Sequence, residues 1–152
     1  MKKIFLFSAL TLILLILIFH DSFLRVFLKT SFFEYQILGN VTPFKPENRT
    51  VRVGISTEPT LNFGVLPQGF LARKRLNLTN HEALPAKFRV EVLGRVRSLV
   101  SVSESEFILG PNETKILEIA FNASKLGNYT GKLRIWVRVP RAQALNFLLG
   151  II

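Results

Sequence analysis

Residues 120–140 read AFNASKLGNYTGKLRIWVRVP, and the second half of this stretch decides the fold. From Lys132 to Val139, basic or aromatic residues alternate with apolar ones. A period of two places the apolar side chains on one face of a β-strand and the polar side chains on the other. The stretch therefore predicts a strand that is buried on one side only.

The same period of two recurs upstream. It is clear in VRVGIS (51–56), AKFRVEVLG (86–94) and TKILEIAFNA (114–123), and weaker at 61–66, 72–80, 98–103 and 106–109. Glycine, proline and asparagine turn signals separate these segments. We therefore expect a mainly β domain over residues 50–140, a sandwich of seven or eight antiparallel strands.

Four short motifs carry a family resemblance: LNFGVLPQG (61–69), RLNLTN (75–80), LGPNET (109–114) and GNYTG (127–131). On these motifs residues 61–135 resemble the immunoglobulin-like (Ig-like) domains of the major-sperm-protein, PapD-like and ASH group, and related domains of archaeal surface proteins. The resemblance implies that the expected sandwich has an Ig-like fold. The resemblance implies protein binding and scaffolding rather than catalysis. It assigns no ligand site to individual residues.

The N-terminus has a different composition. Lys2 and Lys3 precede 16 residues without a charge, about 24 Å of helix, and apolar residues after Ser22 can complete a span. We predict a signal-anchor transmembrane helix over residues 1–30, followed by a stalk over 31–49. The two lysines favour a cytoplasmic N-terminus. A cleaved secretory signal and a prepilin-type leader are the alternatives.

Six of the nine asparagines begin an Asn-x-Ser/Thr triplet (sequon), where chance would give about one. They are Asn40, Asn48, Asn77, Asn112, Asn122 and Asn128, and all follow the apolar run. This density predicts N-glycosylation on an extracytoplasmic face. The chain has no cysteine, whereas small secreted animal domains usually carry disulfides, so we expect a prokaryotic and specifically archaeal envelope.

The inventory of reactive side chains is small. There are two histidines, one aspartate and no cysteine, so no metal cluster, thiol nucleophile or Ser-His-Asp triad is expected. We predict that the protein is not an enzyme, and that it has no catalytic, metal-binding or cofactor-binding residues and no cofactor.

Basic residues and the C-terminal tail are the candidate contact sites. The net charge is +10, and basic residues concentrate at 73–75, 95–97 and 134–141. They predict either a cationic face with contacts from Arg134, Trp136 and Arg138, or an ordinary solvated surface. In the apolar tail 141–152, Phe147 and Leu148 are further candidate contacts. The tail is too short to span a bilayer, and packing on its own domain, on a partner and on the membrane surface all remain open.

Together these features predict a membrane-anchored, N-glycosylated extracytoplasmic module with a structural or protein-interaction role in a cell envelope. The expected partners are the membrane and another envelope or S-layer protein. Neither nucleic acid nor a small-molecule substrate is expected. The alternative is a subunit of a surface filament, associated with a pilus or an archaellum, whose hydrophobic N-terminal helix mediates assembly.

Overall fold

The computed structural model describes residues 26–44 and 60–150. These residues form eight strands and two short 3-10 helices: β1 Leu28–Thr42, β2 Thr60–Pro67, β3 Leu71–Thr79, β4 Ala86–Gly94, η1 Arg95–Ser98, β5 Val100–Val102, β6 Glu106–Leu109, β7 Thr114–Asn122, β8 Gly127–Pro140 and η2 Gln143–Gly150. The expectation of a mainly β domain is confirmed, and the described residues contain eight strands, of which β1 lies before the range predicted for the domain.

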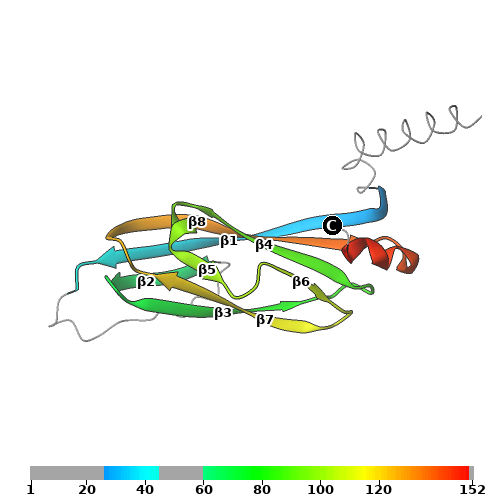
Figure 1. Ribbon diagram of the computed structural model, residues 1–152, viewed down its shortest axis with the longest axis horizontal. Helices are drawn as coiled ribbons and strands as arrows, with labels where there is room; N and C mark the ends of the chain where they lie inside the picture. The colour runs from blue at the N-terminus through cyan, green and yellow to red at the C-terminus, as the bar shows by residue number, and fades with distance from the viewer. Residues whose placement is uncertain (1–25, 45–59, 151–152) are drawn as a thin grey trace, which may run out of the picture.

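The strands form two sheets, and Figure 1 shows β1 and β8 in one layer and β3 and β7 in the other. The first sheet has five strands in the order β2-β1-β8-β4-β6, and the second has three in the order β3-β7-β5. All neighbouring strands are antiparallel except β1 and β2, which are parallel. The expectation of a wholly antiparallel sandwich is wrong at this pair. Residues 43–59 are long enough to return the chain to the middle of β1, where Thr60 pairs with Gln36 and β2 runs in the same direction as β1.

β1 also corrects the predicted layout of the N-terminal part. Residues 28–30, predicted as the end of the anchor, and residues 31–42, predicted as stalk, lie in this strand. It pairs with β8 over its whole length, from Leu28↔Pro140 to Val41↔Gly127. It pairs with β2 only over its second half, from Gln36↔Thr60 to Thr42↔Pro67.

The rest of the predicted transmembrane helix lies outside the described residues, as does the strand expected at 51–56. Within the part of the chain that the structure does describe, no helix is both long enough and apolar enough to cross a bilayer.

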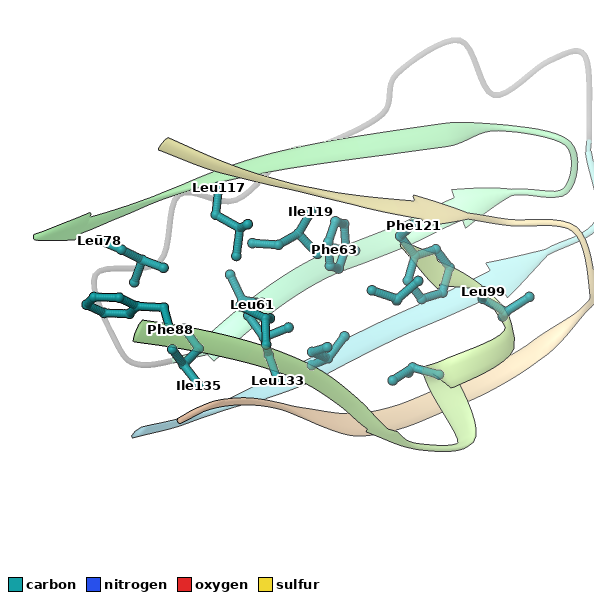
Figure 2. Close-up of a cluster of buried hydrophobic side chains, with 14 of the residues drawn as sticks. Leu61, Phe63, Leu78, Phe88, Leu99, Leu117, Ile119, Phe121, Leu133 and Ile135 are labelled. Atoms are coloured by element: carbon teal, nitrogen blue, oxygen red, sulfur yellow. The ribbon is translucent and has the colours of Figure 1, made fainter. Parts of the chain in front are cut away.

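The inner faces of the two sheets enclose the hydrophobic core. Figure 2 shows Leu117, Ile119 and Phe121 of β7 facing Leu133 and Ile135 of β8. These five side chains are fully buried, as the period of two predicts for one-sided strands. Two aromatic pairs extend the core, Phe63 with Phe121 at 5.2 Å and Phe88 with Phe107 at 5.4 Å between ring centroids.

Tyr129 closes one end of this core. Its half-buried ring packs against the edge of Phe121, with centroids 6.3 Å apart, and its hydroxyl donates a hydrogen bond to the Leu126 carbonyl at 3.2 Å. The neighbouring Asn128 is exposed. The GNYTG segment at the start of β8 therefore alternates, with the tyrosine turned toward the core and the sequon asparagine toward water.

Candidate functional site

The outer face of the five-stranded sheet carries a cluster of aromatic and charged side chains near its middle. Because side chains alternate along each strand, the buried residues of β8 leave Arg134 and Trp136 on the outer face. The register then places Glu34 and Phe32 of β1 opposite them on one side, and Glu91 and Arg89 of β4 on the other. We call these six residues the Trp136 face.

An aromatic pair forms the centre of the Trp136 face. The rings of Phe32 and Trp136 lie directly opposite each other on neighbouring strands, with centroids 5.1 Å apart and planes inclined by 49°. Phe32 is 53% exposed, a high value for a phenylalanine in a sheet, and Trp136 is half-buried. The indole N–H of Trp136 points to a Glu91 carboxylate oxygen at 3.4 Å. The tryptophan is therefore oriented by a polar contact while the phenylalanine stays accessible.

Arg134 lies against this pair and is fixed by Glu34. Its guanidinium carbon is 5.6 Å from the ring centroids of both Phe32 and Trp136, within the range of cation–π attraction. Its Nε and Nη2 both donate to Glu34 Oε1, at 2.8 and 2.6 Å, while Lys132 donates to Glu34 Oε2 at 2.7 Å. The hydrogen bonds from Lys132 and then Arg134 lower the pKa of Glu34 below its ordinary value.

Ion pairs neutralise the charges around the Trp136 face. Arg89 contacts Glu91 at 3.2 Å and Glu106 at 3.6 Å, and Lys87 contacts Glu106 at 3.4 Å. Charges of opposite sign therefore border the aromatic pair on β1, β4 and β6. The outer face of this sheet therefore carries both positive and negative side chains rather than a single cationic surface.

The structure does not bring the three basic segments onto one surface. In segment 73–75, Arg73 and Arg75 are exposed on β3 of the other sheet, and Lys74 lies 5.9 Å from the ring centroid of Phe63. Segment 95–97 forms η1, where Val96 is fully buried. Only the segment that begins at Arg134 contributes to the Trp136 face.

The other predicted contact residues lie outside the Trp136 face. Arg138 is on the outer face of β8, one pair of residues beyond Trp136 and opposite Thr30 and Lys87. Phe147 is 63% exposed on η2, which Figure 1 shows near the end of β8. The backbone of Leu148 lies in the same helix. The next residue, Leu149, is buried, so part of the predicted tail packs on its own domain.

Five of the six sequon asparagines lie among the described residues. Asn40 and Asn128 are opposite each other on β1 and β8, the first half-buried and the second exposed. Asn77 and Asn122 are exposed on β3 and β7, and Asn112 is exposed in the turn before β7. Asn48 falls outside the described residues.

Sequence reasoning missed the half of the Trp136 face that β1 contributes. Phe32 and Glu34 lie in a segment that was predicted as stalk. The sequence does contain a signal for them. Phe32 and Glu34 are two residues apart, as are Trp136 and Arg134 in RIWVR, so the two strands can pair aromatic with aromatic and acid with base. Glu91 lies in the segment 86–94, which was predicted as a strand but not linked to a site.

Among residues 26–44 and 60–150, no three histidine, aspartate or glutamate side chains come together as a metal site would require. The Trp136 face presents aromatic surface, a fixed guanidinium and paired carboxylates. The expectation that the protein is not an enzyme stays a prediction.

Comparison with protein-family models identifies a match that covers more than half of the chain. A family model described as "HYDIN/CFA65/VesB-like, Ig-like domain" matches residues 54–147, from just before β2 into η2. It supports the Ig-like fold and leaves β1 outside the matched range. No curated protein matches the chain.

Proposed function

The chain belongs to the HYDIN/CFA65/VesB-like family of Ig-like domains, and on that premise we propose that it is a protein-interaction module that binds its partner through the Trp136 face. The observation that carries this proposal is the Phe32–Trp136 pair, an aromatic contact on the outer side of a sheet in which Phe32 is more than half exposed and Trp136 is half-buried. Tryptophan and arginine are enriched among the residues that contribute most to protein–protein affinity.

The composition of the Trp136 face also favours a protein partner. A typical interface has an apolar centre and a polar rim. Here the aromatic pair is the centre, and the ion pairs of Glu34, Glu91 and Arg89 form the rim. Because Arg134 is already held by Glu34, little side-chain entropy is lost when a partner packs against it.

We further propose that the module is membrane-anchored, N-glycosylated and extracytoplasmic, in a cell envelope of archaeal type. The apolar N-terminal run and the six sequons support this proposal. The positions of the sequons are compatible with binding, since Asn40 and Asn128 are each eight residues along their strand from Phe32 and Trp136, or about 26 Å. Glycans at these positions would leave the aromatic pair accessible.

Interaction with an envelope protein can be tested on the full chain in its native membranes. Trp136→Ala and Phe32→Ala should each reduce recovery of co-purifying envelope protein at least tenfold, as expected for a contact that dominates an interface. Arg73→Ala, on the outer face of the other sheet, is the matched control and should leave recovery unchanged. Equal recovery with all three variants would refute the assignment of this face.

A further inference from the structure

Exposed aliphatic side chains on the strands lie beside sequon asparagines. In the strands that the structure describes, the exposed large aliphatic residues are Val65, Leu71, Ile108 and Ile116. Ile116 is directly opposite Asn77, and Leu71 is directly opposite Asn122. Val65 is opposite Asn40 on the other sheet, and Ile108 is opposite Lys87. The register therefore pairs all of them except Ile108 with a sequon asparagine.

Two of these pairs lie near opposite ends of the outer face of the three-stranded sheet. Alternation along β7 buries Leu117 and leaves Ile116 and Asn122 on the outer face, with exposed fractions of 58% for Ile116 and 53% for its counterpart Leu71 on β3. Leu71 and Asn77 are six residues apart on β3, or roughly 20 Å. Directly opposite residues of an antiparallel pair have Cβ atoms about 5 Å apart. A sugar ring on either asparagine is therefore within reach of the aliphatic side chain beside it.

The side-chain amides of Asn77 and Asn122 are available to carry a sugar. Both residues are exposed, and within the described part of the chain neither side chain takes part in a hydrogen bond. Asn62 and Asn80, which begin no sequon, use their side chains to bind backbone groups. Attachment joins the asparagine Nδ2 to the anomeric carbon of a phosphate-activated sugar, with loss of an amide proton and release of the phosphate group.

From this register we propose that the first sugar on Asn77 packs on Ile116 and the first sugar on Asn122 packs on Leu71, so that the glycans stabilise this face of the sheet. The ligand is the chain's own N-linked hexose or N-acetylhexosamine. A pyranose ring presents C–H groups on its faces, and packing them on an aliphatic side chain removes apolar surface from water while the hydroxyl groups stay hydrated. The inference rests on the N-glycosylation proposed above and does not depend on the Trp136 face.

Thermal unfolding of the full chain tests the packing, with one preparation from an archaeal host that N-glycosylates and one from a host that does not. Ile116→Thr keeps a β-branched side chain and leaves the Asn77 sequon intact. It should lower the melting temperature of the glycosylated chain by about 3 °C or more beyond its effect on the unglycosylated chain. In the Asn77→Gln background this difference should vanish, because the sugar is absent from both preparations. Leu71→Thr with Asn122→Gln repeats the test at the other end.

Ile108→Thr is the matched control, since Ile108 is 48% exposed on a strand but is opposite Lys87. It should change the melting temperatures of the two preparations equally. Glycopeptide mass spectrometry of the glycosylated preparation determines whether Asn77 and Asn122 carry sugar. If they do, and Ile116→Thr and Leu71→Thr behave like the control, the packing is refuted while the N-glycosylation stands. If both asparagines are bare, this inference and the N-glycosylation at these two sites fail together.

Discussion

Asn80 is a single buried side chain that joins two turns. Its amide nitrogen lies 3.0 Å from the carbonyl oxygens of Leu84, Leu109 and Gly110, and its amide oxygen accepts a hydrogen bond from the backbone N–H of Glu82. It is 2% exposed. The motif RLNLTN, which ends in Thr-Asn, was part of the sequence resemblance. The structure explains the asparagine, because its one side-chain amide forms hydrogen bonds with the backbone of the turn after β3 and of the turn after β6.

We expect Asn80→Ala to lower the free energy of unfolding by about 3 kcal/mol, because it leaves several buried backbone groups without a partner. Asn80→Asp should be at least as damaging, since a carboxylate would face three carbonyl oxygens. Thermal unfolding of the purified full chain measures both. The control is Asn62→Ala, which removes one exposed local hydrogen bond to Gly64 and should change stability little. Similar melting temperatures for Asn62→Ala and Asn80→Ala would contradict this account.

Glu34 gives the Trp136 face a predictable response to acid. Its pKa is lowered in the folded protein by Lys132 and Arg134, so its contribution to stability is fully present above the pKa of the unfolded chain. That contribution is lost as the pH falls through the lower folded pKa. We expect Glu34→Gln to lower the melting temperature near neutral pH and to differ progressively less from the parent as the pH approaches 3.

A melting curve series from pH 3 to pH 7 checks this sign. Lys132→Gln, which removes the first of the two hydrogen-bond donors, should show a weaker form of the same convergence. If the parent and Glu34→Gln differ by a constant amount over the whole range, the carboxylate does not titrate in the way the geometry implies.

At the scale of elements, the close pairing of β4 and β8 where β4 ends depends on two glycines. Gly94 and Gly131 are directly opposite each other, and Gly94 has a positive φ of 89° where β4 turns into η1. A Cβ on Gly131 would collide with the carbonyl oxygen of Leu93 and with the buried side chain of Val96. Close approach of the strands is what allows Val96 to enter the core.

We expect Gly131→Ala to destabilise the domain by about 3 kcal/mol or more, because backbone atoms on the facing strand cannot move aside easily. Gly150→Ala is the control, since nothing lies within 4 Å of a Cβ built there. Chemical denaturation of the two variants should separate them clearly. Equal midpoints would mean that β4 and η1 can shift without loss of packing.

The elements differ in how well the sequence predicted them. β4, β7 and β8 alternate between buried and outward residues over much of their length, and the sequence shows this alternation. β1 was not, because Phe32 and Phe33 are consecutive, both are more than half exposed, and Gly39 weakens the strand pattern. The position of β1 depends on pairing with β2 and β8, which are distant in the sequence, so its own residues carry little of the alternation that predicts a strand.

At the scale of the whole molecule, the sandwich and its outward-facing Arg134 and Trp136 could be predicted, but the partners of these residues could not. Alternation assigns a side chain to a face and does not specify which strand lies beside it. The strand order β2-β1-β8 depends on where a 17-residue connection returns the chain. For this reason the Phe32–Trp136 pair emerged only from the structure.

The exposure of the sequon asparagines predicts which of them carry sugar in the native protein. Glycopeptide mass spectrometry should find sugar at Asn77, Asn112, Asn122 and Asn128, which are exposed. Asn40 should be occupied less often, because it is half-buried and directly opposite Asn128. Asn62 and Asn146, which begin no sequon, are internal negative controls. If all the sequons are bare, the extracytoplasmic assignment loses its main support.

The antiparallel pairing of β1 with β8 also determines how the domain would respond to mechanical load. Leu28 and Pro140 are paired, so the strand that leads to the N-terminus and the strand that leads to η2 end side by side. Tension applied between these two ends would separate the pairs one after another, as a zipper opens, at low force. Tension applied between Leu28 and the opposite end of β8 would instead shear all the pairs at once. An N-terminally anchored copy would therefore yield readily when pulled through its C-terminus and resist when pulled through the Gly127 end.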